Sequence, residues 1–286
     1  DSTIEYPVIT KPTDGCGSNG FSVCKDYAEL LVGYEKAKAA SPTGSVLIEK
    51  FVNNNSVVVF YTFSEGKLIF SGLEDKFPVR YSETGSYVAG MHLFESLHKD
   101  EFVQKFEAKL GELFAHIGIK EGSLWIEVFR DNDRYYFNEV GFRYSGSVSI
   151  YPVDYFYGIN QVAADIHYAL TGESNICSHA SLINSNVPHK KSYCVYNVHM
   201  LPGTISNICG IEELREMPEV VFIADTKRVG DNVKATGTVG QVFAFVHFVY
   251  DTEEELQQMI TNIHQILHVY DGNGNDLLVN SFEYIE

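Results

Sequence analysis

The sequence lacks long hydrophobic runs. In its 286 residues no apolar stretch approaches the roughly 20 residues that a helix needs to cross a bilayer. The chain also starts without the basic segment and hydrophobic stretch of a secretory signal peptide. From these two absences we expect no membrane partner and a cytoplasmic location.

Cysteine is sparse, and basic residues are outnumbered. The five cysteines include no C-x-x-C pair and no histidine at metal-ligand spacing, so we expect free thiols rather than a zinc site. Lysine and arginine total 21 against 38 acidic residues, which gives a net charge of −17. This balance argues against a nucleic acid partner, because its phosphates would be repelled. It does not exclude a phosphate ligand held by locally positive groups or by a metal ion.

The hydrophobic patterning predicts an α+β protein with more than one unit. A length of 286 residues suggests two units at roughly 100–200 residues each. Thr252 and Glu255 form a capping box at the start of a C-terminal helix, and Asp26 is a suitable cap for an N-terminal one. Residues 79–96 have no clear period, and we expect an active-site loop there. Helical spacing predicts helices over 25–40, 99–119 and 158–172.

A glycine-rich stretch near the start of the chain is the first candidate for a functional site. The sequence KPTDGCGSNGFSV, residues 11–23, holds Gly15, Gly17 and Gly20 in a G-x-G-x-x-G spacing. A dinucleotide-binding fold needs a helix directly after the last glycine, whereas the FSV that follows here is typical of a strand. A protein kinase would need H-R-D and D-F-G motifs and a P-loop would need G-K-[ST], and the sequence has none of these.

What remains is a hairpin with a flexible glycine tip and Lys11 at its root. Glycines allow backbone N–H groups to approach phosphate oxygens closely, and the ammonium group of Lys11 would reach the same oxygens. The alternative is an ordinary glycine-rich turn beside a solvated lysine. The loop alone leaves both interpretations open.

Two glutamates on a second predicted hairpin favour phosphate binding. Glu127 and Glu139 flank a DND turn, so their carboxylates would converge at the open end of the hairpin. Two like charges in apolar strands are costly unless a cation lies between them, and Mg²⁺ bound by carboxylates and nucleotide phosphates removes that cost. The alternative is that one of the two points into solvent. Arg143 follows, and its guanidinium group would suit a carboxylate or phosphoryl group. The alternative is a solvated surface arginine. A polar turn at Ser145 and Gly146 comes next.

The strand VLIEKFV is a third candidate. It contains Glu49 and ends through Lys50, Phe51 and Val52. Its backbone groups would suit the edge of an adenine base, while the carboxylate accepts a hydrogen bond from the amino group. Taken alone, this stretch is no more than a strand end.

Together, the lysine with its glycine loop, the E-K-F-V stretch and the two glutamates ending in NEVGFR resemble the ATP-grasp superfamily. The similarity runs from about Tyr6 to Thr171 and is greatest to the branch of biotin carboxylase, carbamoyl-phosphate synthase and the L-amino acid ligases. The resemblance implies an α+β ATP-grasp fold, in which two α+β subdomains hold ATP between them, followed by a small mixed α/β domain. The implied units are an ATP-grasp lid subdomain (1–52), a metal and substrate subdomain (53–172), a linker (173–192) and a C-terminal ligase-type domain (193–286).

The resemblance also implies roles for single residues. Lys11 would bind the phosphates of the cofactor ATP and act in catalysis with Arg143, which would face the acyl phosphate and the substrate carboxylate beside Ser145–Gly146. Glu127 and Glu139 would hold Mg²⁺, or alternatively Mn²⁺. The residues around the adenine would be Glu49, Lys50, Phe51 and Val52. The residues of the lid over the phosphates would be Gly15, Cys16, Gly17, Ser18 and Gly20.

The reaction of the resembled family is ATP-dependent ligation. A carboxylate attacks the γ-phosphate, and an amine then displaces phosphate from the acyl phosphate. We therefore expect a carboxylate–amine ligase that acts on small-molecule substrates such as an amino acid, and a homodimer is compatible with the family. The alternative is a non-catalytic ATP-grasp nucleotide-binding module that needs a partner.

The sequence departs from the pattern of the family at one metal-binding position and at the ribose-binding positions. Gly141 stands where many relatives have an asparagine as an additional metal ligand, so full two-metal coordination is not expected. Ser56 and Val57 stand where a ribose-binding acid or histidine is usual. The family's N-terminal domain would precede residue 1, and we expect a fragment that binds ATP weakly by itself.

Overall fold

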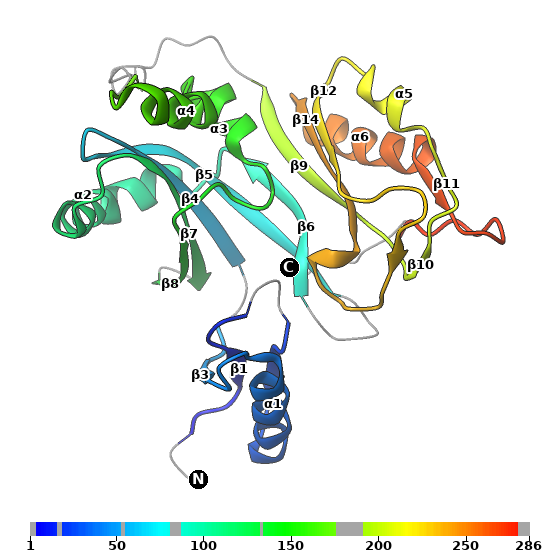
Figure 1. Ribbon diagram of the computed structural model, residues 1–286, viewed down its shortest axis with the longest axis horizontal. Helices are drawn as coiled ribbons and strands as arrows, with labels where there is room; N and C mark the ends of the chain where they lie inside the picture. The colour runs from blue at the N-terminus through cyan, green and yellow to red at the C-terminus, as the bar shows by residue number, and fades with distance from the viewer. Residues whose placement is uncertain are drawn as a thin grey trace.

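The protein consists of a large sheet covered by helices and a smaller unit that contains the N-terminus (Figure 1). The computed structural model describes residues 4–15, 19–52, 55–80, 87–131, 134–175 and 191–279. The predicted lid residues Cys16, Gly17 and Ser18, and residues 176–190 of the predicted linker, lie outside the described residues.

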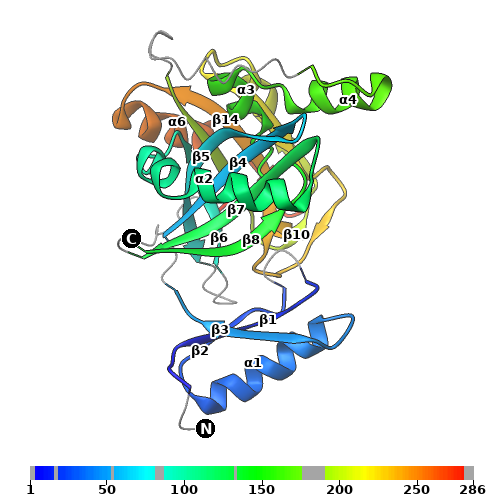
Figure 2. The same cartoon turned by 90° about the vertical axis from the view of Figure 1, so that its left-hand side faces the viewer.

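The smaller unit, here called the lid, is a three-stranded antiparallel sheet with one helix. Its elements are β1 (Val8–Pro12), β2 (Ser22–Cys24), α1 (Tyr27–Ala40) and β3 (Val46–Lys50). The strands have the order β2-β1-β3, and α1 packs along one side of the sheet (Figure 2). Asp26 accepts a hydrogen bond from the N–H of Glu29 and caps α1 as predicted. The strand expected after Gly20 is confirmed as β2.

The large sheet has eight strands, and every neighbouring pair is antiparallel. The strands are β4 (Asn55–Ser64), β5 (Lys67–Arg80), β6 (Tyr87–Phe94), β7 (Gly122–Asp131), β8 (Arg134–Gly141), β9 (Ser192–His199), β12 (Val220–Asp225) and β14 (Val242–Tyr250). Their order is β12-β14-β9-β6-β5-β4-β7-β8.

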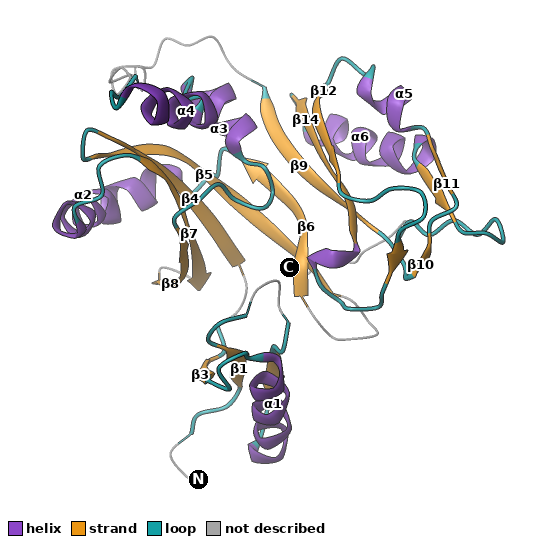
Figure 3. Ribbon diagram, viewed as in Figure 1, coloured by secondary structure: helices purple, strands orange, loops and turns teal. Residues whose placement is uncertain are grey.

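Helices cover both faces of this sheet (Figure 3). On one face, α2 (Lys99–Ile117) buries Phe102 and Phe114 in a core shared with β4, β5 and β7. On the other face lie α3 (Ile150–Tyr157) and α4 (Gln161–Thr171), and Val153 of α3 packs with Val58 and Phe60 of β4. The helices predicted over 99–119 and 158–172 are thus confirmed. None of the described helices is long and apolar enough to span a membrane.

The C-terminal residues continue the same sheet. β9 pairs with β6 through Leu93 and Cys194, among others, and β14 and β12 extend the sheet further. α6 (Glu253–Ile266) packs against this end, and Thr252 caps it as predicted, because Glu255 N–H donates to Thr252 Oγ1 over 3.2 Å. The returning bond of the predicted capping box differs, since the Glu255 carboxylate accepts from the N–H of Asp251 over 2.7 Å. The smaller elements are β10 (Gly203–Thr204), β11 (Asn207–Cys209), α5 (Ile211–Arg215), β13 (Asn232–Val233), the 3₁₀ helix Val239–Gln241 and β15 (His268–Tyr270). One sheet therefore runs across the predicted boundary at residues 173–192, and the division into domains stays a prediction.

The expectation of a loop over residues 79–96 is wrong for residues 79–80 and 87–94, and residues 81–86 lie outside the described residues. β5 extends to Arg80, and β6 lies between β5 and β9 inside the sheet. Met91, His92 and Phe94 of β6 are all buried. A strand that is covered on both faces lacks the alternation of apolar and polar residues that marks a half-exposed strand, so its sequence shows no clear period.

Candidate functional site

Lys11 lies on the central strand of the lid sheet, and its ammonium group has two partners. Nζ lies 2.6 Å from Oε2 of Glu49 on β3. It also donates a hydrogen bond of 3.1 Å to Oδ1 of Asn138 on β8 of the large sheet. Because Lys11 pairs with Leu47, two residues from Glu49, both charged side chains lie on one face of the lid sheet. The predicted adenine-binding carboxylate thus contacts the predicted phosphate-binding lysine.

Glu127 and Glu139 lie opposite each other in the β7–β8 hairpin. They are direct partners in the ladder, so both side chains lie on the same face of the sheet. Glu127 also pairs with Val58, whose side chain belongs to the core on the α3 side. Glu139 is exposed, whereas the side chain of Glu127 is only 12% exposed. The hairpin therefore brings the two carboxylates together, and their role as metal ligands stays a prediction.

A buried ion pair holds Glu127 in its charged form. Lys76 on β5 contacts Oε1 of Glu127, and Asn138 Nδ2 donates to Oε2 over 2.8 Å. Burial alone would raise the pKa of Glu127, but the Lys76 charge and the two hydrogen bonds hold that pKa below its usual value. Burial would likewise lower the pKa of Lys76, yet Glu127, Glu74 and Glu139 keep it raised.

The root of the glycine loop is fixed to the lid on both sides. Asp14 accepts hydrogen bonds from the hydroxyls of Ser41 at 2.5 Å and Thr43 at 2.7 Å, and these bonds lower its pKa. Gly20 has a φ of +78°, and a Cβ there would lie 2.6 Å from Cβ of Ala40. Gly15 is equally constrained, because its Cβ would lie 2.5 Å from Cγ of Pro12. The described ends of the loop therefore need their glycines for backbone conformation and space.

The predicted adenine-binding stretch is the exit from the lid. Lys50 pairs with Val8 at the end of β3, and Phe51 N–H donates to the carbonyl of Pro7 over 3.0 Å. Val52 follows, half-buried, before the chain enters the large sheet. The stretch thus joins the lid to β4, next to Glu49 and Lys11.

Trp125 fills the space beside Gly141 and lies under Arg143. Trp125 and Gly141 are partners across the hairpin, and a Cβ at Gly141 would lie 2.4 Å from the indole ring. The guanidinium group of Arg143 is stacked over the same ring, 5.2 Å from its centroid, and donates to the carbonyl of Tyr144 over 2.7 Å. With the indole in this position, only glycine fits at position 141.

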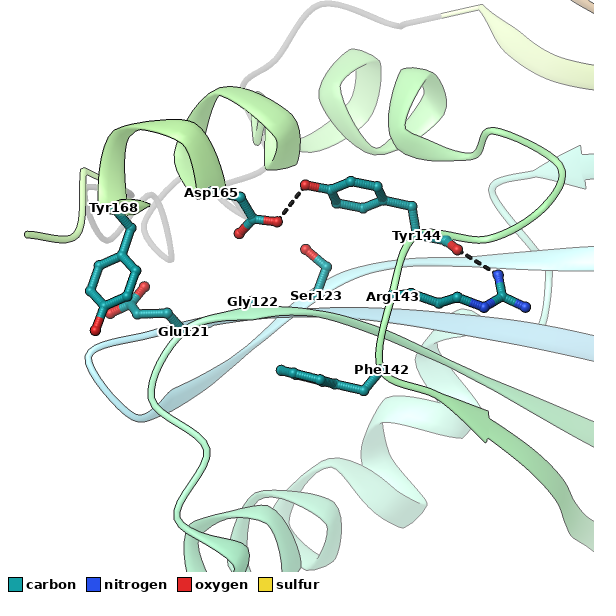
Figure 4. Close-up of a pocket in the computed structure, with 8 residues that line it drawn as sticks. All are labelled: Glu121, Gly122, Ser123, Phe142, Arg143, Tyr144, Asp165 and Tyr168. Carbon is teal, nitrogen blue, oxygen red and sulfur yellow. Dashed lines mark hydrogen bonds between the residues drawn. The ribbon is translucent and has the colours of Figure 1, made fainter. Parts of the chain in front are cut away.

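A shallow pocket of about 320 Å³ lies next to Arg143, between the ends of β7 and β8 and helix α4 (Figure 4). The Tyr144 hydroxyl donates to Asp165 of α4 across its rim. Burial and this hydrogen bond to a carboxylate both raise the pKa of Tyr144. Ser123 of β7 and Phe142 also line the pocket. Arg143 belongs to the lining, but its side chain is directed away from Asp165 and Tyr168 (Figure 4).

A row of hydroxyl groups connects the predicted substrate turn with the core. Ser145 Oγ lies 3.0 Å from Ser147 Oγ, which lies 2.8 Å from Ser149 Oγ. Ser149 donates to Oε2 of the buried Glu74 over 3.2 Å, and Oε1 of Glu74 lies 2.8 Å from Nδ1 of His92. This row of hydrogen bonds therefore connects the turn at Ser145 and the exposed Gly146 to side chains of β5 and β6.

Comparison with known proteins identifies this architecture. Residues 1–63 match the family model described as carbamoyl-phosphate synthase L chain, ATP binding domain. Among solved structures, the L-amino acid ligase from Bacillus licheniformis superimposes with a TM-score of 0.72 at 20% identity, over 95% of this chain and 65% of that one. Biotin carboxylase from Campylobacter jejuni superimposes with a TM-score of 0.69 at 17% identity, over 98% of this chain and 60% of that one. The chain has the fold of the ATP-grasp proteins.

A curated relative extends this ATP-grasp similarity over most of the sequence. Dapdiamide A synthase from Enterobacter agglomerans is 21% identical over 270 residues, which are 91% of this chain and 62% of the relative. The chain thus spans less than two thirds of the length of the relatives it matches. At these identities the solved structures establish the fold, and the predicted ATP-grasp fold class is confirmed.

Three residues of this candidate site were not found by sequence reasoning: Lys76, Asn138 and Trp125. Lys76 lies 51 positions before Glu127 in the sequence. The two side chains meet because the sheet places β5 and β7 on either side of the single strand β4. Asn138 directly precedes Glu139, and strict alternation would send these neighbours to opposite faces. Trp125 was visible as the sole tryptophan, two residues before Glu127 on the same predicted strand. That spacing of two on a strand was the one available signal that it shares a face with Glu127.

Proposed function

We propose that this chain forms the ATP-binding and metal-binding part of an ATP-dependent carboxylate–amine ligase that acts through an acyl phosphate. The supporting observation is the meeting of lid and large sheet at one point. Lys11 of the lid contacts Asn138, and Asn138 contacts Glu127, whose carboxylate lies opposite Glu139. A cation from one unit and two carboxylates from the other are the groups needed around a single triphosphate.

ATP is the proposed nucleotide. Lys11 would exchange its contact with Glu49 for the phosphate oxygens, and Glu49 would then accept a hydrogen bond from the adenine amino group. The glycine loop between Gly15 and Gly20 would close over the phosphates. The matched family model describes an ATP-binding domain over residues 1–63, which include all of these positions.

The chemistry of the carboxylate pair fits Mg²⁺. Hard divalent cations prefer oxygen ligands, and Mg²⁺ with a nucleotide commonly takes one or two carboxylates and completes its shell with phosphates and water. Within the described residues no group of three or more His, Cys, Asp or Glu side chains could hold a metal alone, so phosphate oxygens are needed. Glu127 and Glu139 would hold the ion, and Mn²⁺ prefers the same donors. When bound, the ion would neutralise charge on the phosphates.

The proposed reaction transfers a phosphoryl group and then an acyl group. A carboxylate oxygen of the substrate attacks the γ-phosphorus, and ADP leaves. An amine nitrogen then attacks the acyl carbon, phosphate leaves, and the nitrogen loses a proton. Arg143 would hold the substrate carboxylate by paired hydrogen bonds beside the turn of Ser145 and Gly146. An amino acid is the proposed carboxylate, since an L-amino acid ligase shares the fold over 95% of this chain.

Two measurements test this function. Isothermal titration calorimetry with ATP, with and without Mg²⁺, should show binding that depends on the metal. ADP release should then rise when a carboxylate and an amine are both supplied, with mixtures of amino acids as the first candidates. Absence of metal-dependent ATP binding would refute the proposal.

The second candidate is a nucleotide-binding module without catalysis, which works with a partner or with another part of its own protein. Gly141 favours it, because the position of an additional metal ligand has no side chain. Metal-dependent ATP binding without ADP release under any substrate mixture would support this alternative. A cytoplasmic location and a homodimer remain proposals for either function.

A further inference from the structure

Asn138 lies in a β-bulge of the predicted metal-binding hairpin. Glu127 pairs with Glu139, but the next residue of β7, Val128, pairs with Phe137. Asn138 is therefore an extra residue on β8 without a partner in the ladder. A bulge redirects a side chain relative to regular alternation, and here it turns Asn138 toward the carboxylate of Glu127.

The amide group of Asn138 is used at both ends. Its Oδ1 accepts from the ammonium group of Lys11 over 3.1 Å, and its Nδ2 donates to Oε2 of Glu127 over 2.8 Å. An ammonium group can only donate and a carboxylate can only accept, so these two partners fix the orientation of the amide. Both hydrogen bonds involve a charged group and belong to the stronger class.

The neighbouring Gly141 has no side chain that could contact Glu127. The indole of Trp125 occupies the space that a Cβ at this position would fill. An amide group is nevertheless present beside Glu127, supplied from three positions earlier by the bulge. The amide thus lies one residue before Glu139, and not at position 141, two residues after it.

We propose that Asn138 is a positioning residue that joins Lys11, the proposed phosphate ligand, to Glu127, the proposed metal ligand. It orients the carboxylate for the cation and holds the lysine of the lid within reach of the same triphosphate. This inference rests on the proposed function. It adds Asn138, whose contact with Lys11 joins two residues 127 positions apart in the sequence.

The test compares Asn138→Leu with a matched control. Leucine keeps the size of asparagine but can neither accept from Lys11 nor donate to Glu127. Asn232→Leu makes the same change at an exposed strand position, where the amide donates to Thr204 over 3.0 Å far from the site. Affinity for adenylyl imidodiphosphate, a non-hydrolysable ATP analogue, is measured by calorimetry with and without Mg²⁺ for each chain.

We expect Asn138→Leu to weaken binding in Mg²⁺ by about 10–100-fold, as removal of an outer partner of a metal ligand does. Without Mg²⁺ the loss should be clearly smaller, whereas a merely structural role would lower both affinities equally. Asn232→Leu should match the unmodified chain in both conditions. Asn138→Ala is a second variant in case the leucine disturbs folding, and unchanged Mg²⁺ dependence in the folded variants would overturn the inference.

A double-mutant cycle tests the connection to the lid. The loss caused by Asn138→Leu should be smaller in a Lys11→Met chain than in the unmodified chain, because one of its two partners is already absent. Equal losses in both chains would mean that the two residues act independently, and the joining role would be refuted. If the unmodified chain shows no Mg²⁺-dependent binding, the proposed function fails instead.

Discussion

Lys76→Met tests whether the ion pair with Lys76 compensates the charge of Glu127 and so stabilises the fold around the candidate site. Methionine keeps a similar length and an apolar stem, so the variant removes mainly the charge. The side chains of Lys76 and Glu127 are 23% and 12% exposed. Losing one partner costs about 3–5 kcal/mol for a fully buried pair and about 0–1 kcal/mol for an exposed pair. For this intermediate burial we expect a loss of about 2 kcal/mol in the free energy of unfolding.

The loss should depend on pH in a defined direction. In the unmodified chain the folded pKa of Glu127 is lowered, so its contribution is present above the ordinary value of about 4.3 and is lost as pH falls through the folded pKa. Without Lys76, burial raises that folded pKa, and the ionised carboxylate then destabilises the variant near neutral pH. The difference between the two chains should therefore be largest near neutrality and should shrink as pH falls.

Urea denaturation at about pH 7.5 and about pH 5 measures both effects. The matched control is Lys191→Met, since Lys191 pairs with Asp251 over 2.9 Å with exposures of 44% and 54%. That exposed pair should be worth about 0–1 kcal/mol at either pH. If Lys76→Met costs no more than Lys191→Met, or costs the same at both pH values, the charge balance inferred for Glu127 is wrong.

Three further changes examine the rest of the site. Glu139→Gln should weaken Mg²⁺-dependent nucleotide binding by about tenfold or more in calorimetry, while thermal unfolding stays near that of the unmodified chain because Glu139 is exposed; unchanged binding would make it a solvated strand residue. Gly141→Asn should lower the free energy of unfolding by about 1–3 kcal/mol in urea denaturation, since the indole must move. Adding Trp125→Phe should restore part of that loss. A Gly141→Asn chain as stable as the unmodified chain would contradict the steric argument. Arg143→Ala should shift the emission of Trp125, the sole tryptophan, to longer wavelength, because the ring loses its cover; an unaltered spectrum would show that the stacking does not persist in solution.

The predictable parts of the fold are those that local chemistry determines. Asp26 predicts the start of α1 and Thr252 predicts the start of α6. Each side-chain oxygen caps an N–H group three residues later, so a few adjacent residues are enough to recognise the helix start. The hairpin of Glu127 and Glu139 is equally local, since a short turn sets its approximate register. β6 was not predictable in this way, because its covering on both faces depends on distant strands and helices.

The residues of the candidate site also fall into those that a local sequence pattern predicts and those that depend on distant strands. Lys11, Glu127 and Glu139 were found because a residue type in a local pattern pointed to a chemistry. Asn138 and Lys76 were not found, since one depends on a bulge and the other on the order of three strands. Register shifts and strand order are consequences of packing over the whole sheet, and no short stretch of sequence contains them.

The surroundings of Gly141 bear on the choice between a ligase and a remnant without catalysis. A site that had simply lost a ligand would leave an empty space and a carboxylate with fewer partners. Here the space is filled by the Trp125 indole, on which Arg143 is stacked, and Glu127 has both an ammonium and an amide partner. A largely buried carboxylate is costly unless it is paired, and here the amide of Asn138 and the ammonium group of Lys76 keep Glu127 ionised. The filled space beside Gly141 and the compensated charge of Glu127 support the proposed ligase over the proposed module without catalysis.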